Sequence, residues 1–301
     1  MPLVAFVRSE QRSARVRELL RLSAPSGSQR RSVAAIVVLA LLVGIGAAQP
    51  VLEETREQTS RTDVHAFFVI DTSRSMLAAD GPGGVTRFDR ARAAANRFRD
   101  GLATVPVGLA SLTDRVLPLL FPTADRDTFE STLRLALGVD RPPSSVAGDV
   151  RATKFESLAA VGNRNFFRDV ERRLAVVFSD AETTPFNPTF LSDAFAEGNV
   201  DLIVVRFGRP GERVYGAGGV PEPYAPDPGS AAAVERLASA IGGEGFHEDE
   251  LDAALGAART AVGEGETVIR SEKPDIHPLA PYVLLAALMP LGFLLYRRNL
   301  A

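Results

Sequence analysis

Three small oxygen-bearing side chains follow one apolar run in the sequence. The run 64–70 ends at Asp71, and Ser73 and Ser75 follow at alternating positions. Carboxylate and hydroxyl oxygens are the ligands that hard divalent cations take, in preference to sulfur or imidazole. Asp-x-Ser-x-Ser by itself is more typical of a turn or a helix cap. Placed directly after a buried strand, it predicts one part of a metal site.

The remaining oxygen ligands are expected from other strand ends and loops. Asp180 follows the apolar run 174–178, and Thr153 opens a predicted helix after a loop rich in proline, glycine and serine. Hydroxyl groups that are alternatives to that of Thr153 come from Ser144, Ser145 and Thr183.

This ligand set suits a binding role, because two aspartates and three hydroxyls barely neutralise a divalent ion. The ion keeps an exchangeable position that an Asp or Glu of a protein partner can fill. Mg²⁺ fits this set best, Mn²⁺ is an alternative, and Ca²⁺ fits less well.

The elements that position these residues alternate along the chain. Phe88, Ala91, Ala95 and Phe98 recur at helical spacing after the motif. One strand follows its predecessor after only Thr113-Asp114-Arg115, which predicts a hairpin and an antiparallel edge strand. The pattern predicts an α/β fold with a doubly wound, mostly parallel sheet, in which ligands bind at the carboxyl ends of the strands. The predicted strands are the apolar runs 64–70, 107–112, 116–120, 174–178 and 202–207.

Composition narrows the possible functions. The chain has 301 residues, 46% of them hydrophobic and 24% charged, which is typical of globular protein. A formal net charge of −3 gives no reason to expect nucleic-acid binding. Cysteine is absent, which excludes disulfides, thiolate metal sites and cysteine nucleophiles.

Two hydrophobic segments flank the polar part of the chain and predict attachment to a membrane. A spanning helix needs about 20 mostly apolar residues. The segment 279–296 meets this length and precedes Arg297-Arg298. The segment 32–48 follows an arginine-rich tail and is either a second spanning helix or the core of a signal peptide.

Arginines at both ends of the chain predict the topology. By the positive-inside rule both termini are expected in the cytoplasm, with residues 49–278 outside it. The predicted divisions are a basic cytoplasmic tail (1–31), a transmembrane helix or signal-peptide core (32–48), a stalk (49–62), a globular domain (63–263), a linker (264–278), a transmembrane helix (279–296) and a cytoplasmic end (297–301).

The domain at 63–263 resembles a von Willebrand factor A (VWA) domain. The three-part motif of that family maps onto Asp71, Ser73, Ser75, Thr153 and Asp180, and the runs 75–80, 87–92 and 121–125 resemble membrane-anchored bacterial members of the aerotolerance (Bat) type. The resemblance implies a metal ion-dependent adhesion site (MIDAS), a protein partner, and a role in assembling or scaffolding envelope complexes. It also implies, more weakly, association with a MoxR-type AAA ATPase. Arg74 and Ala181 stand where the family usually has glycine.

Two other functions are weighed against this one. A structural VWA module with a vacant metal site is supported by Arg74, a large cation beside the metal loop. A metal-dependent hydrolase or phosphatase is disfavoured, because Ser73 replaces the second acid of an Asp-x-Asp motif. Gly-x-Ser-x-Gly, a glycine-rich phosphate loop and His-Glu-x-x-His are absent from the sequence. The sequence therefore predicts a binding protein and not an enzyme.

Overall fold

The computed structural model describes residues 29–54, 57–141, 143, 153–162, 166–216, 218–271 and 275–300. The chain divides into two compact units. One comprises Glu57–Ser271, and the other comprises Met1–Arg56 together with Glu272–Ala301. Most of the predicted basic tail lies outside the described residues, as do Ser144 and Ser145.

The unit Glu57–Ser271 is built on a six-stranded sheet in the order β5-β4-β3-β6-β7-β8. Neighbouring strands are parallel except for β5, which pairs antiparallel with β4 at the edge. The predicted fold class is thereby confirmed for the sheet. The strands are β3 (Val64–Asp71), β4 (Val107–Leu112), β5 (Val116–Thr123), β6 (Arg172–Ser179), β7 (Asp201–Arg206) and β8 (Glu244–His247).

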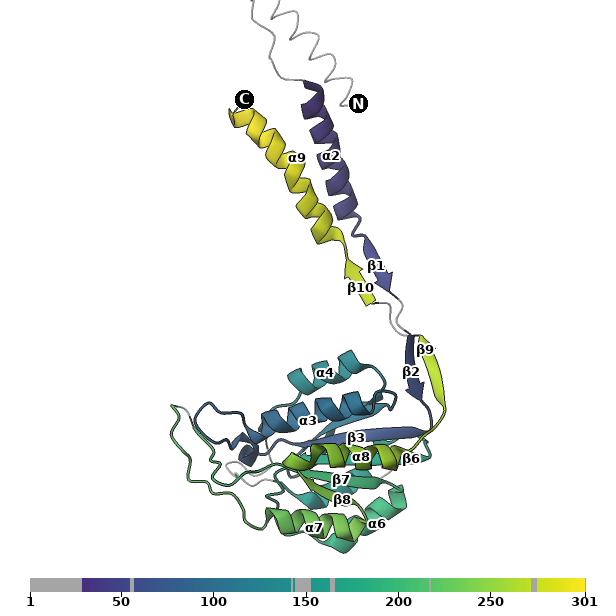
Figure 1. Cartoon of the computed structure of the whole chain (residues 1–301), viewed down its shortest axis with the longest axis vertical. Helices are drawn as coiled ribbons and strands as arrows, with labels where there is room; N and C mark the ends of the chain where they lie inside the picture. Colours follow the sequence, from purple (N-terminus) through teal and green to yellow (C-terminus); the bar gives the residue numbers. More distant parts are fainter. Residues whose placement is uncertain are drawn as a thin grey trace, which may run out of the picture. The chain divides into compact units, whose positions relative to one another are not determined.

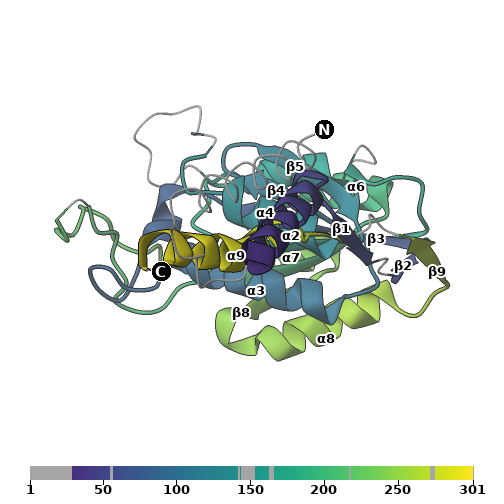
Figure 2. The ribbon, with the colours of Figure 1, turned by 90° about the horizontal axis from the view of Figure 1, so that it is seen from above.

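Helices cover both faces of this sheet, because alternate side chains of a strand point to opposite faces. Phe68 and Ile70 of β3 pack against one set of helices, whereas Phe67 and Val69 pack against the other. The first set is α3 (Arg87–Gly101), α4 (Arg126–Leu135) and α8 (Leu251–Val262), with α3 beside α8 (Figure 2). The second set is the 3₁₀ turn η2 (Phe155–Leu158), α5 (Ala159–Gly162), α6 (Pro188–Gly198) and α7 (Ser230–Ile241).

The central strand β3 fixes where a ligand can bind. It lies between β4 and β6, so the chain leaves β3 toward one side of the sheet and later returns on the other. This reversal creates a crevice at the carboxyl ends of β3 and β6. Asp71 ends β3 and Asp180 follows β6, so both carboxylates lie at that crevice.

Two antiparallel ribbons form where the sequence predicts only a polar stalk and a linker. In one unit β1 (Val51–Glu54) pairs with β10 (Asp275–Pro278). In the other unit β2 (Glu57–Arg61) pairs with β9 (Thr267–Ser271). The chain therefore enters and leaves the unit Glu57–Ser271 side by side.

Two long helices, α2 (Gln29–Ala47) and α9 (Ala280–Leu300), pack against each other (Figure 1). A Cβ at Gly46 would lie 2.8 Å from Leu284 Cδ2, so glycine permits this close approach. Arg297 Nη1 donates to Ser32 Oγ at 2.7 Å. Among the described helices, α9 is the one that is long and apolar enough to cross a membrane, through Ala280–Arg297. The apolar part of α2, Arg31–Ala47, is shorter, so a second span stays a prediction.

Candidate metal centre

The Asp71 carboxylate is the centre of a buried hydrogen-bond cluster. Its Oδ1 accepts the Ser73 N–H at 2.9 Å. Its Oδ2 accepts the Ser179 hydroxyl at 2.5 Å, and the Thr153 hydroxyl lies 3.2 and 3.1 Å from the two oxygens. The predicted strand-end carboxylate and the predicted loop threonine are therefore in contact, although 82 positions separate them.

The two serines of the motif connect Asp71 to the second carboxylate. Ser73 precedes the 3₁₀ turn η1 (Arg74–Leu77), whose Met76 side chain is fully buried and fixes the turn against the core. Ser73 Oγ and Ser75 Oγ are 3.0 Å apart, and the Ser75 hydroxyl lies close enough to the Asp180 carboxylate to lower its pKa. The five predicted ligands thus form one cluster, and each is at most 1% exposed.

The backbone after Asp180 explains why glycine is usual at the next position. Ala181 has φ of 58°, in the left-handed region that costs a residue with a Cβ about 1–2 kcal/mol. This turn brings the Glu182 N–H to Asp180 Oδ1 at 3.1 Å. Thr183 is the one alternative to Thr153 as a metal ligand that lies within the described residues. Its hydroxyl instead accepts the Phe155 N–H at 3.0 Å. The hydrogen bonds of its hydroxyl, to Phe155 and to the Thr153 and Thr184 carbonyls, support the turn and not the Asp71 carboxylate.

A buried arginine that sequence reasoning missed lies against the second carboxylate. Arg87, at the start of α3, is 1% exposed. Its Nη1 lies 3.0 Å from Asp180 Oδ2, 3.0 Å from Glu182 Oε1 and 2.9 Å from Tyr224 Oη. Its Nε donates to Glu212 Oε2 at 2.6 Å. One guanidinium therefore joins the Asp180 loop to the segment that follows β7.

Ion pairs and backbone hydrogen bonds hold the segment after β7 against α3 and the loop that follows η1. Arg90 pairs with both Glu212 and Glu248. The Ala79 N–H donates to the Arg213 carbonyl at 2.9 Å, and the Arg213 N–H returns the bond at 3.0 Å. Arg74 does not point at the candidate ligands: it pairs with Glu222 of this segment and lies 3.5 Å from Asp140.

The cluster holds more negative charge than its buried cation neutralises. Asp71, Asp180, Glu182 and Glu212 have side chains that are at most 2% exposed or fully buried, and they face one equally buried guanidinium, that of Arg87. Burial raises the pKa of Asp71. Burial, and then repulsion by Asp71, raises the pKa of Asp180 to about 6 against the pull of Arg87. Such shifts mark a place where an added cation is favourable.

The donor types match a hard cation in particular. No group of three or more His, Cys, Asp or Glu side chains arranged to hold a metal occurs in the described part of the chain. The candidate centre instead combines two carboxylates with three hydroxyls, all of which are oxygen donors. Oxygen donors without imidazole or thiolate fit Mg²⁺ or Mn²⁺.

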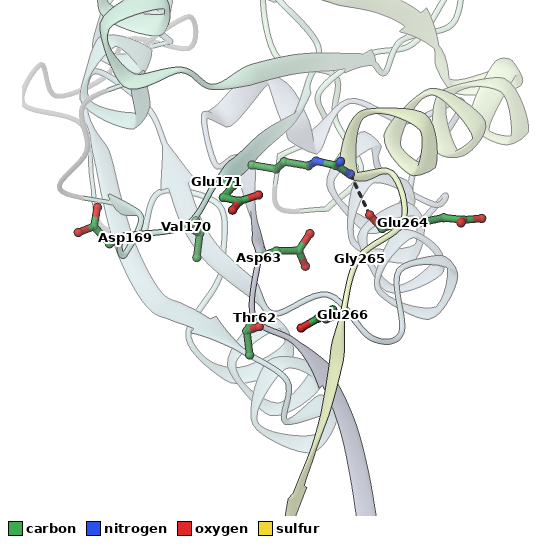
Figure 3. Close-up of a pocket in the computed structure, with 9 residues that line it drawn as sticks. Thr62, Asp63, Asp169, Val170, Glu171, Glu264, Gly265 and Glu266 are labelled. Atoms are coloured by element: carbon green, nitrogen blue, oxygen red, sulfur yellow. Dashed lines mark hydrogen bonds between the residues drawn. The ribbon is translucent and has the colours of Figure 1, made fainter.

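A larger hollow lies at the opposite, amino ends of β3 and β6 (Figure 3). It has a volume of about 710 Å³ and is lined by acidic side chains. Asp63 within it pairs with Arg61, and Arg172 donates to the Glu264 carbonyl at 3.2 Å. These contacts tie the β2–β9 ribbon region to the sheet. The hollow is separate from the candidate centre.

Comparison with known proteins agrees with this geometry. Residues 66–182 match the family model described as the von Willebrand factor type A domain. This part of the chain is similar to a VWA domain. The match begins in β3 and ends just after Asp180, so it includes both carboxylates of the candidate centre. A search of curated protein sequences found no match.

Two solved structures share the fold of this VWA domain. BatB from Bacteroides thetaiotaomicron is 19% identical, with a TM-score of 0.54, over 66% of this chain and 98% of that one. An aerotolerance-related membrane protein from Bacteroides fragilis NCTC 9343, solved with multiple mutations to serine, is also 19% identical. Its TM-score is 0.53 with the same coverage. At this identity the likeness concerns the fold.

Proposed function

We propose that this protein is a membrane-tethered VWA domain that binds a protein partner through a divalent cation. Asp71, Ser73, Ser75, Thr153 and Asp180 would hold the cation, with Mg²⁺ as its natural occupant and Mn²⁺ or Ca²⁺ as substitutes. The bound cation would offer an open position to a carboxylate of the partner. The proposed role is in assembling or scaffolding envelope complexes and is not enzymatic.

The observation that supports this proposal best is the convergence of Asp71 and Asp180 in one buried, hydroxyl-lined cluster. Ser75 contacts Asp180, and Ser73 connects Ser75 to Asp71. Two ionised carboxylates buried in one cluster repel each other, and a cation bound between them relieves this repulsion. Hydroxyl groups supply neutral oxygen ligands without adding charge.

The alternative of a vacant, structural site also has a specific observation behind it. Arg87 already places a guanidinium nitrogen 3.0 Å from Asp180 Oδ2 and supplies part of the missing positive charge. However, Arg87 is shared with Glu182 and Glu212, and its ion pairs within the described residues do not include Asp71. Arg74, the residue that first suggested a vacant site, is paired with Glu222 instead. These contacts leave the Asp71 side of the cluster without a cation.

The proposed location follows from α9 and from the arginines at both ends of the chain. Both termini would lie in the cytoplasm, with two spans and the VWA domain outside. A MoxR-type AAA ATPase would then meet only the cytoplasmic ends, so it is a secondary partner in this proposal. Protease protection of the VWA domain in intact cells would contradict this topology.

The metal site is tested by titrating the full-length chain in an uncharged detergent with Mg²⁺ and with Mn²⁺. We expect Asp71→Asn and Asp180→Asn each to lower cation affinity at least tenfold, because each removes a charged ligand. Asp169→Asn, in the acidic hollow of Figure 3, is the matched control and should leave the affinity unchanged. Equal affinity in all four proteins would refute the proposed site.

Partner binding is tested by crosslinking in intact cells with and without a chelator. A partner that binds through the metal should be lost both in chelator and in the Asp71→Asn variant. Capture that persists in the variant would refute metal-dependent binding.

A further inference from the structure

A cleft of about 460 Å³ adjoins the candidate metal centre on the side of β7 and β8. Asp180 and Glu182 line it on the side of the centre, and Arg206 and His247 line it from the ends of β7 and β8. Ser230, at the start of α7, also lines it. Since Asp180 belongs to both places, a ligand on the metal lies next to this cleft.

Arg206 is the cation in this cleft that lacks a counter-charge. It is partly exposed, and its Nη1 lies 3.5 Å from the neutral Ser230 hydroxyl. Within the described part of the chain, no carboxylate oxygen lies within 4.0 Å of its guanidinium. The two other arginines of the cleft differ: Arg87 pairs with three carboxylates, and Arg209 lies 3.4 Å from Glu248.

A glycine leaves a notch between two of these guanidinium groups. Gly208 has φ of 154°, and a Cβ built on it would lie 3.6 Å from Arg206 Nη1 and 3.6 Å from Arg87 Cζ. The two guanidinium groups therefore border the same small space, which a side chain at this position would fill.

The acidic side chains of the cleft are already occupied by other donors. Asp180 and Glu182 accept from Arg87, and Glu182 also accepts the Tyr224 hydroxyl at 2.5 Å and the Asp227 N–H at 3.1 Å. Asp227 accepts the Gly229 N–H at 2.8 Å. None of these carboxylates forms an ion pair with Arg206. A planar anion that enters the cleft would thus find a guanidinium ready for a charge-assisted hydrogen bond.

We propose that this cleft binds a second carboxylate of the partner, with Arg206 as its principal contact. The partner segment would then carry two acidic side chains, one for the cation and one for Arg206. This inference rests on the proposed metal-dependent function and specifies the class of ligand for the same site. Arg206 acts as a specificity-determining residue: it selects an acidic pair over a single acid.

The test uses the full-length chain in uncharged detergent and capped synthetic peptides. One peptide has a single aspartate among glycines, and a series adds a glutamate after one, two or three further glycines. Titration calorimetry in Mg²⁺ should show the best two-acid peptide binding about tenfold more tightly than the one-acid peptide, the gain of one charge-assisted hydrogen bond. Arg206→Gln should remove that gain, and Arg206→Lys should keep part of it.

The control is Arg134→Gln, an exposed arginine of α4, which packs on β4 and β5 at the other edge of the sheet. It should keep the whole gain. If the one-acid peptide binds in Mg²⁺ but the second acid adds nothing, or the gain survives Arg206→Gln, this inference fails alone. If the binding of both peptides is independent of Mg²⁺, the proposed function fails, and this inference fails with it. Equal binding of a glutamate-only peptide in chelator would overturn the two-point arrangement.

Discussion

Removing the positive charge of Arg87 is the perturbation that examines the buried cluster most directly. Arg87→Met fills a similar volume but leaves Asp180 and Glu182 without their guanidinium, whereas Glu212 keeps Arg90. Breaking a buried ion pair by removing one partner costs about 3–5 kcal/mol, because a buried charge is left uncompensated. The Glu182 N–H that still donates to Asp180 and the nearby Ser75 hydroxyl are neutral, so they do not replace the lost charge. We therefore expect a loss of about 4 kcal/mol in the free energy of unfolding without metal.

Addition of Mg²⁺ should recover part of this loss. A cation that binds only the folded state stabilises it by about 2.7 kcal/mol at one hundred times its Kd. The variant carries one positive charge fewer beside Asp180, so it should bind Mg²⁺ more tightly than the wild type. At equal Mg²⁺ concentration, the gain in stability should then be larger in Arg87→Met than in the wild type.

The assay is urea unfolding of the full-length chain, because urea does not screen charges as a salt denaturant does. The chain has no tryptophan, so Phe186→Trp in every variant reports fluorescence from the VWA domain alone. The matched control is Arg97→Met on the same helix, whose pair with Asp252 is exposed and should contribute less than about 1 kcal/mol. A loss below about 1 kcal/mol in Arg87→Met, or a smaller Mg²⁺ gain than in the wild type, would refute the charge-compensation argument.

Three further predictions concern stability, and the first two use the same urea assay. Phe68→Ala should destabilise by about 3–5 kcal/mol, because the fully buried ring packs edge-on against Phe98, Phe129 and Phe178; a loss below 2 kcal/mol would contradict that packing. Thr86→Ala should cost about 1 kcal/mol by removing the capping box with Asp89, and Thr86→Ser should restore it. The Arg61 hydrogen bond lowers the pKa of Asp63, so this pair stabilises the fold above about pH 4 and stops doing so as the pH falls through the lowered pKa. Thermal unfolding should accordingly separate Asp63→Asn from the wild type at pH 6, and the difference should shrink below pH 4; a constant difference would contradict the assignment.

The strands that carry the site could be predicted because they are buried and their residues are mostly apolar. All eight residues of β3 are buried, as are all six of β4, so the apolar runs and the strands nearly coincide. β8 is short, glycine-containing and half-exposed, and its sequence gives only a weak signal. The two ribbons are polar, and what makes them strands is the pairing of segments about 200 positions apart, which no local pattern reveals.

The candidate centre was predictable only in part. Asp71 and Asp180 follow apolar runs, and that position identifies them in the sequence. Ser179 donates to Asp71 but lies between the predicted run 174–178 and Asp180, where a polar residue at the end of the strand was the available signal. Arg87 looks like one of many helix arginines. Its partners lie 93 to 137 positions away, so its role depends on where the segment after β7 folds.

The pairing of β2 with β9 has a mechanical consequence. A partner attached at the carboxyl end of β3 and a tether at the ribbon would pull on opposite ends of the same strand. Such tension acts along β3 and shears its hydrogen bonds to β4 and β6 all at once, instead of opening them one by one. Because the chain enters and leaves through adjacent antiparallel strands, the load divides between two polypeptide segments that are pulled in the same direction. If the proposed partner and membrane anchor are both attached, the domain would transmit force between them without opening the hydrogen bonds of β3 one at a time.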